Sequence, residues 1–216
     1  MITFGIITDG SEKDRVNAVI DSIFKECPRP QIIVVGPNNN HFDYFADTIT
    51  EKGGMIDDLN FDESIKPAWI TKKKNLITQH ARYDNVVYMH DYIKLRQGWY
   101  NGFCIFDKRN CKWQVQMNKI INLDGTRYRD WVSWKEKVIK PYHWIGQKDM
   151  YISGAYWVAK KNFMEKYPLD ESKSWGESED VEWCSRWKDK EQVYYMNTHS
   201  GVQLLKQKDK VFPIHD

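Results

Sequence analysis

MITFGIITDGSEKDRVNAVIDSIFKECPRPQIIVVG, residues 1–36, holds two short apolar runs that flank a segment with helical periodicity. Residues 4–8 and 32–35 are dominated by Ile, Val and Phe, which is typical of buried strands. The segment between them is long enough for a helix that returns the chain to the starting edge of a sheet. This stretch therefore predicts a strand–helix–strand unit with parallel strands.

The boundaries of this first helix also follow from the sequence. Ser11 precedes it, and Asp14, three residues later, makes an approximate capping box. Pro28 and Pro30 are expected to end it, because proline cannot continue the helical hydrogen bonding. Its expected apolar stripe consists of Val16, Val19, Ile20, Ile23 and Phe24.

The same alternation continues through the first half of the chain. We expect helices at residues 42–49 and 69–81, a brief strand at 55–56 and a buried strand at 86–89. Strands that alternate with helices are typical of an α/β fold with a mostly parallel central sheet flanked by helices. Ligands of such sheets bind at the carboxyl ends of the strands.

The second half is less regular. Residues 124–149 are rich in Trp, Tyr, Lys and Arg without a clean period, so we expect a long functional loop or an irregular insert there. No repeat or linker divides the chain, which indicates one domain over residues 1–216. The other expected elements are strands at 113–121, 151–159 and 192–196, and helices at 160–167 and 179–187.

The composition excludes several classes of protein. The 32 basic and 30 acidic side chains give a formal net charge of +2, so nucleic acid is not expected as a partner. The four cysteines are scattered without a CxxC pair, which argues against a metal–thiolate site and a disulfide framework. We find neither a leader peptide nor a transmembrane segment, and therefore expect a cytoplasmic protein.

Lys73 stands out in the helix expected at residues 69–81. It lies four residues after Trp69 and four before Ile77, near the centre of the apolar face. A lysine there must snorkel to water, pair with an acid or point into a polar cavity. Phosphate binding and simple snorkelling both remain open for Lys73, whereas its neighbours Lys72 and Lys74 are expected at the surface.

Two strand ends carry candidate metal ligands. The strand at 86–89 delivers His90 and Asp91, and a carboxylate there can hold Mg²⁺ or Mn²⁺ while diphosphate oxygens complete the coordination. The other interpretation of Asp91 is an aspartate that caps a turn, which is common at strand ends. His199 follows the strand at 192–196 and is either a metal ligand or polar loop material.

Four acidic residues lie within residues 177–182, where a helix is expected to begin. Glu179 and Asp180 suit the positive end of the helix dipole, so an acidic helix N-terminus at the surface is one interpretation. Trp175 and Val181 are among the apolar residues around the acids, which favours a cleft wall instead. A carboxylate in a cleft can take the proton from an attacking hydroxyl.

Taken in order, these segments resemble the GT-A glycosyltransferases, close to the family-2 type and its galactosyltransferase relatives, over nearly the whole chain. Thr8-Asp9-Gly10 resembles the uridine-binding start of that fold. KKKNLITQHARYDNVVYMHDYIKL at 72–95 is similar to the family's basic helix and the strand with its DxD metal motif. ISGAYWVAKKNFMEKYP at 152–168 resembles the segment that borders the donor sugar. WGESEDVEWCSRW at 175–187 resembles the Trp-Gly…Glu-Asp motif with the catalytic base of inverting members.

The resemblance implies a GT-A fold and a metal-dependent, inverting hexosyltransferase that moves a sugar from a UDP-sugar to an acceptor hydroxyl. Residues 1–95 would bind the nucleotide-sugar, and residues 96–216 would bind the acceptor. It implies that Asp91 holds Mn²⁺ or Mg²⁺ and that His199 matches a later histidine ligand of some members. The DxD motif departs from the pattern, because residues 90–92 read His-Asp-Tyr with a single carboxylate.

The remaining site residues follow from the same resemblance. Asp180, with Glu179 beside it, would act as the general base, and Lys73 would add positive charge beside the phosphates. Nucleoside contacts are expected from Thr8, Asp9, Gly36 and Asp57, and Gly154 would allow close approach to the donor sugar. An acceptor platform is expected from Trp131, Trp134, Tyr142 and Trp144.

Two other functions stay open. The incomplete DxD motif is compatible with a nucleotide-sugar or carbohydrate-binding module without turnover. A sugar-1-phosphate nucleotidyltransferase would share a related α/β fold, although it normally needs a Gly-rich phosphate loop after the first strand. Gly10 alone is a poor substitute for that loop, and the sequence has neither GxxxxGK[ST] nor GxGxxG.

Overall fold

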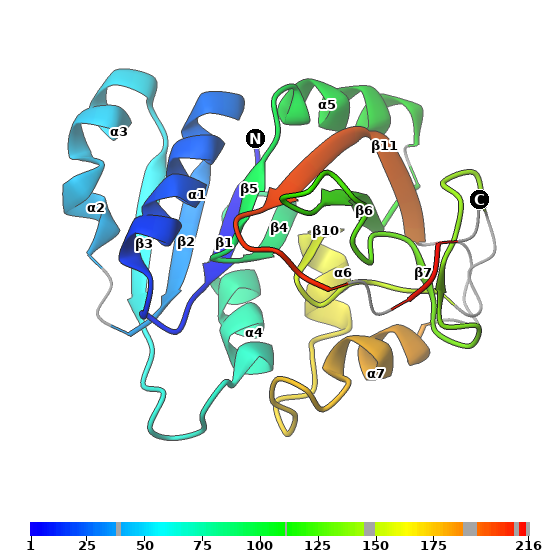
Figure 1. Cartoon of the computed structure of the whole chain (residues 1–216). Helices are drawn as coiled ribbons and strands as arrows, with labels where there is room; N and C mark the ends of the chain where they lie inside the picture. The colour runs from blue at the N-terminus through cyan, green and yellow to red at the C-terminus, as the bar shows by residue number, and fades with distance from the viewer. Residues whose placement is uncertain (38–39, 111, 145–149, 188–193, 210–211, 215–216) are drawn as a thin grey trace.

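An eight-stranded sheet forms the centre of the computed structural model, which describes residues 1–37, 40–110, 112–144, 150–187, 194–209 and 212–214 (Figure 1). The strand order is β3-β2-β1-β4-β10-β6-β11-β5, so strands from both halves of the chain share one sheet. Its strands are β1 (Thr3–Ile7), β2 (Gln31–Gly36), β3 (Met55–Asn60), β4 (Asn85–His90), β5 (Ile93–Leu95), β6 (Val115–Ile121), β10 (Tyr156–Lys160) and β11 (Tyr194–Leu204).

The first four strands run parallel to one another, as the alternation predicts. Strands β1 and β2 are buried along their whole length, which explains their continuous apolar sequences. Strand β10 joins antiparallel between β4 and β6, whereas β11 runs parallel to β6. The prediction of an α/β fold with a mostly parallel central sheet is therefore confirmed.

Helices cover both faces of this sheet. A Cβ atom at Gly5 of β1 would overlap the side chain of Ile77, so the absence of a side chain lets one helix approach β1 closely. Phe4, on the other face of β1, contacts Trp99 with ring centroids 5.4 Å apart. The helices that carry Ile77 and Trp99, α4 and α5, thus lie on opposite faces (Figure 1). The helices are α1 (Lys13–Glu26), α2 (His41–Tyr44), α3 (Ala46–Lys52), α4 (Ile70–His80), α5 (Trp99–Arg109), α6 (Lys161–Lys166) and α7 (Glu179–Ser185).

The start of α1 differs from the prediction. The Ser11 hydroxyl donates to Asp9 Oδ1 at 2.6 Å, and the Ser11 amide donates to the same oxygen at 2.9 Å. The helix begins two residues later at Lys13, and its N-cap residue Glu12 makes no capping hydrogen bond through its side chain. The predicted capping box of Ser11 and Asp14 is wrong, because the Ser11 side chain binds Asp9 in a tight turn instead.

The second half holds further differences. The strand expected at 151–159 is broken into β9 (Met150–Tyr151) and β10, and the strand expected at 192–196 continues to Leu204 as β11. The expected insert at 124–149 contributes β7 (Val132–Ser133) and β8 (Val138–Ile139), and β7 pairs with both β8 and β9 in a small sheet of order β8-β7-β9. Residues 145–149 and 192–193 of these predicted segments lie outside the described residues.

Strand β5 and helix α5 have no counterpart in the prediction. Among the described residues, no helix combines the length and the apolar character that crossing a bilayer requires.

Candidate functional site

The carboxyl ends of β1 and β4 lie side by side beneath a cavity of about 330 Å³. Ile7 and His90 are partners in this parallel pairing, so the residues that follow them, Thr8 and Asp91, become neighbours. The Thr8 hydroxyl donates to the Asp91 carboxylate at 2.8 Å. Asp9 lines the same cavity. Strand pairing thus brings three of the predicted site residues together.

A second cavity of about 310 Å³ adjoins the first. Its walls include three further predicted residues, Gly154, Glu179 and Asp180. Four residues line both cavities, namely His90, Tyr92, Trp175 and Lys208. The two cavities therefore form adjoining compartments of one site at the carboxyl edge of the sheet, where an open α/β sheet binds its ligands.

Two acidic residues at the start of α7, Glu179 and Asp180, line the second cavity, and we refer to them as the acid pair. The Gly154 amide donates to Asp180 Oδ2 at 2.9 Å, and the Val181 amide donates to Asp180 Oδ1 at 2.9 Å. Burial raises the pKa of the Asp180 and Glu179 carboxyls, while the Lys74 ammonium acts in the opposite direction on both. A raised pKa in a cavity wall suits a group that exchanges a proton with a ligand.

Lys74 lies directly behind this acid pair and is only 1 % exposed. Its Nζ atom donates to the Gly154 carbonyl at 2.8 Å and lies 4.5 Å from the ring centroid of Trp157. Burial lowers the pKa of Lys74 to about 8, although Glu179 and Asp180 favour its charged form. The prediction of a surface position for Lys74 is wrong, because α4 is covered here by the segment around Gly154 as well as by the sheet.

Lys73 lines the first cavity and is 3 % exposed. Its Nζ atom donates to the Thr8 carbonyl at 2.7 Å and forms an ion pair with Glu63. Of the three arrangements open to a lysine in an apolar face, Lys73 thus combines pairing with an acid and a position at a polar cavity. It does not snorkel to water.

Gly36 and Asp57 line neither cavity. Asp57 accepts a hydrogen bond from Gln31 Nε2 at 2.7 Å, which joins β3 to β2. A Cβ atom at Gly36 would come within 2.5 Å of Thr8 Cγ2, so this glycine gives Thr8 the room to stand beside it. Both residues support the strands beneath the site.

The resemblance assigns a divalent cation to Asp91 and His199. The side chains that would have to bind this ion, which we call the donor set, do not fit it. Asp91 Oδ2 already accepts hydrogen bonds from Thr8 at 2.8 Å and from the Arg15 guanidinium at 3.2 Å. A metal ion on this carboxylate would therefore face the positive charge of Arg15 at close range. Across the described ranges, no group of three or more His, Cys, Asp and Glu side chains is arranged to hold a metal.

His199 lies apart from the two cavities. Its side chain is exposed and lines neither of them. Its backbone carbonyl packs against Gly102 of α5 so closely that a Cβ atom there would overlap it. The register shift of β11 between Asn197 and Gly201 contains His199. The second ligand implied by the resemblance is therefore not brought to the site.

Of the four aromatic residues expected to form an acceptor platform, only Trp134 lines a cavity of the site. Trp134 is 44 % exposed and lines the second cavity. Trp131 is 2 % exposed and packs against Tyr194, so its face cannot stack on an acceptor. Trp144 lines neither cavity and lies under the Lys140 ammonium, 4.4 Å from the ring centroid. The Tyr142 hydroxyl donates to Asp130 at 2.7 Å, away from the cavities.

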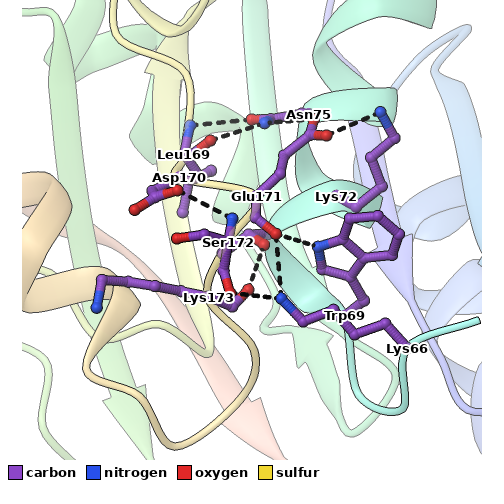
Figure 2. Close-up of polar contacts among 10 residues, drawn as sticks. Lys66, Trp69, Lys72, Asn75, Leu169, Asp170, Glu171, Ser172 and Lys173 are labelled. Carbon is purple, nitrogen blue, oxygen red and sulfur yellow. Dashed lines mark hydrogen bonds and ion pairs between the residues drawn. The ribbon is translucent and has the colours of Figure 1, made fainter.

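A clamp of hydrogen bonds and an ion pair joins α4 to the loop at residues 169–173 (Figure 2). Asn75 Nδ2 donates to the Leu169 carbonyl at 2.9 Å, and Asn75 Oδ1 accepts from the Leu169 amide at 3.0 Å. The side chain of Glu171 accepts hydrogen bonds from Asn75 at 3.0 Å and from Lys72 at 2.9 Å. The Trp69 indole donates to the Glu171 carbonyl at 2.7 Å.

This clamp leads directly to Trp175. The Trp175 amide donates to the Ala68 carbonyl at 3.0 Å, which fixes the backbone beyond the loop. The Trp175 side chain is 67 % exposed although it lines both cavities. An exposed indole at the junction of two cavities offers a flat apolar face to a bound ligand.

Several site residues have no counterpart in the prediction. Arg15, Lys206 and Lys208 line the first cavity, and Arg129 lines the second. A charged residue outside the apolar stripe of a helix, such as Arg15, is ordinary in sequence. Lys206 and Lys208 carried a usable signal, because residues two apart in an extended chain point to the same side.

Comparisons with known proteins support the fold. Neither a family model nor a curated protein matches the sequence. The crystal structure of GalNAc-T7 with UDP, GalNAc and Mn²⁺ is similar to this chain, with a TM-score of 0.70 and 11 % identity over 97 % of this chain and 44 % of that one. S. aureus TarS with UDP-GlcNAc gives a TM-score of 0.69 and 10 % identity over 98 % of this chain and 60 % of that one.

TarS in complex with UDP gives a TM-score of 0.64 and 12 % identity over 90 % of this chain and 60 % of that one. The chain thus spans between 44 % and 60 % of the length of these structures. At such low sequence identity, the similarity shows the fold alone. The expectation from sequence is confirmed at this level, and the chain has the GT-A fold.

Proposed function

We propose that the chain is a glycosyltransferase that moves a sugar from a UDP-sugar to an acceptor hydroxyl. The observation that carries this proposal is the pair of adjoining cavities at the carboxyl edge of the sheet, one lined by Thr8 and Asp9 and the other by Asp180. Each cavity lies within the size range of small-ligand sites. All three structures of the same fold named above contain UDP or UDP-GlcNAc, which supports a uridine nucleotide as the ligand.

The nucleoside would occupy the first cavity and the donor sugar the second. Thr8 and Asp9 would contact the nucleoside, and Gly154 would let the sugar approach the backbone. The shared wall of Tyr92 and Trp175 would then lie beside the bond between sugar and diphosphate. The acceptor would enter past Trp134, whose exposed ring lines the second cavity.

Asp180 would act as the general base. Its two carboxylate oxygens are held by the Gly154 and Val181 amides, which fixes its orientation toward the cavity. It would accept the proton of the acceptor hydroxyl while that oxygen attacks the anomeric carbon, and a single displacement of this kind inverts the anomeric centre. Glu179 is 7 % exposed. It would keep Asp180 in position, and its carboxylate would interact with the Lys74 ammonium as that of Asp180 does.

The sequence also leads us to expect Mn²⁺ or Mg²⁺, and the structure of GalNAc-T7 is described with Mn²⁺. A divalent cation supplies charge that stabilises a leaving diphosphate. Because the donor set around Asp91 does not fit that ion, no step of this mechanism is assigned to it. The measurements of UDP release and of UDP affinity are therefore made both in EDTA and in the presence of Mn²⁺.

The decisive experiment measures UDP release from a panel of UDP-hexoses and UDP-N-acetylhexosamines. We expect the protein to bind UDP. We also expect it to cleave one UDP-sugar of the panel slowly and so release UDP, with water or an added sugar as the acceptor. General-base catalysis contributes roughly 10²–10⁴-fold, so Asp180→Asn should lower the turnover by about that factor while UDP binding is retained. Glu182→Gln is the matched control, because Glu182 belongs to the same helix and pairs with Arg186 outside both cavities.

Three results would speak against the proposal. Normal turnover by Asp180→Asn would refute the base assignment. Tight UDP-sugar binding without any product from the donor panel would favour the binding module without turnover. Release of pyrophosphate from UTP and a sugar 1-phosphate would identify a nucleotidyltransferase instead.

A further inference from the structure

Four cationic side chains converge where the two cavities meet. Arg15, Lys206 and Lys208 line the first cavity, and Arg129 and Lys208 line the second. They come from helix α1, from the segment after β11 and from the loop after β6, so more than 100 residues of sequence separate Arg15 from the others. We refer to these four residues as the cation cluster.

The cation cluster is poorly compensated within the protein. Arg15 pairs with Asp91 at 3.2 Å and with Glu12 at 4.0 Å. Among the described residues, no ion pair joins Arg129, Lys206 or Lys208 to a carboxylate. Burial lowers the pKa of Lys208, and repulsion from the other three cations lowers it further. Like charges gathered in this way destabilise a fold unless an anion is bound among them.

Two buried nitrogen atoms of the cation cluster have no hydrogen-bond partner in the part of the chain that the structure describes. They are Arg15 Nε and Arg129 Nε. A buried, unpaired donor costs free energy, so each such atom in a folded protein calls for an explanation. Both atoms lie beneath the cavity surface, so a ligand with several acceptor oxygens between the cavities would satisfy these donors once the arginine side chains turn toward it.

Tyr92 adds a third, independent observation. The ammonium groups of Lys206 and Lys208 lie 4.3 Å and 5.0 Å from the centroid of its ring. Tyr92 is the last residue of the segment 90–92, which reads His-Asp-Tyr where the resemblance expects the DxD motif. The chain therefore has an aromatic face that supports two lysines at a position where a metal ligand would otherwise stand.

We propose that the cation cluster binds the diphosphate of the donor and neutralises it as the leaving group, in place of a divalent cation. This inference rests on the proposed function. In the transfer, the bond between the anomeric carbon and the diphosphate oxygen breaks, and its electron pair stays on that oxygen. The acceptor oxygen bonds to the anomeric carbon, and its proton passes to Asp180. The additional negative charge on the diphosphate develops between the two cavities, beside Lys208.

The test compares UDP with uridine, which lacks the phosphates, by titration calorimetry in EDTA and again with Mn²⁺. For the wild type we expect the same UDP affinity in both buffers, within twofold. Loss of charge-assisted hydrogen bonds in the Lys206→Met/Lys208→Met double variant should weaken UDP binding at least about tenfold in EDTA. Uridine binding should be unchanged. Lys94→Met is the matched control, because Lys94 lies on β5, outside both cavities.

Thermal unfolding of the same proteins separates a binding defect from misfolding. Without ligand, the double variant should melt at the same temperature as the wild type or higher, because repulsion within the cation cluster is relieved. UDP in EDTA should raise the melting temperature of the wild type and of Lys94→Met, and should raise that of the double variant less at the same UDP concentration. A higher melting point together with weaker UDP binding is the signature of an anion site.

The outcomes distinguish this inference from the proposed function. If UDP binds the wild type only when Mn²⁺ is present, the inference is overturned and the proposed function stands. The same holds if the double variant binds UDP in EDTA as tightly as the wild type. If UDP binds the wild type in neither buffer, both proposals fail.

Discussion

Lys74 and Asp180 are joined through the backbone of Gly154. The lysine donates to the Gly154 carbonyl at 2.8 Å, and the amide of the same glycine donates to the Asp180 carboxylate at 2.9 Å. A buried cation thus stands behind the proposed base while the other side of the carboxylate faces the second cavity. The charge balance of the acid pair depends on a residue that no ligand needs to touch.

Replacing Lys74 by methionine should shift the pH dependence of the reaction. Burial raises the pKa of Asp180 and Lys74 opposes this effect, so the variant raises that pKa further. The base must be ionised to accept a proton, and the acidic limb of the kcat/KM profile should therefore move to higher pH. Profiles recorded between pH 5 and pH 9, with binding of UDP as a check of folding, measure the shift.

Lys72→Met is the control for this prediction, since Lys72 pairs with Glu171 at the partly exposed clamp. Its profile should overlay that of the wild type. An unchanged acidic limb in Lys74→Met would contradict the electrostatic role of the buried lysine.

Asn75→Ala should lower the free energy of unfolding by about 2–4 kcal/mol, because it leaves the amide and the carbonyl of Leu169 without their partners in a buried place. Urea unfolding followed by tryptophan fluorescence measures the change. Lys72→Ala removes a partly exposed ion pair of the same clamp and should cost no more than about 1 kcal/mol. Equal, small losses in the two variants would show that the clamp contributes little to stability.

Trp175→Ala should weaken binding without weakening the fold. The side chain is 67 % exposed, so the free energy of unfolding should stay within about 0.5 kcal/mol of the wild type. Loss of an aromatic face should lower the affinity for a UDP-sugar by about three- to tenfold. Trp144→Ala is the matched control, because Trp144 is another exposed indole and lines neither cavity. Identical affinities in the two variants would remove Trp175 from the site.

The sequence predicts β1, β2 and β4 well because each of these strands is a short apolar run followed by polar residues. The same pattern brings Thr8 and Asp91 together, since strand ends in register must be neighbours. The burial of Lys74 could not be predicted in this way. A helical wheel assumes one buried face, whereas α4 is covered by the sheet on one side and by residues 152–157 and 169–173 on others.

The cation cluster could not be predicted for a different reason. Arg15 lies in an ordinary amphipathic helix, and its partner Asp91 is 76 positions away in sequence. Nothing local in the sequence marks such a pair. His199 shows the opposite failure, because a motif match placed it by order along the chain, while the bulge in β11 directs its backbone toward α5.

Helix α4 makes four different connections with four consecutive side chains. Lys72 contacts Glu171, Lys73 contacts Thr8, Lys74 contacts Gly154, and Asn75 contacts Leu169. Each residue of a helix is rotated by about 100° from the one before it, so all four contacts depend on the rotation of the helix about its axis. A single inserted or deleted residue would turn all four side chains away from their partners at once. Chimeras and insertions in this region should therefore preserve the length of α4, even where individual substitutions are tolerated.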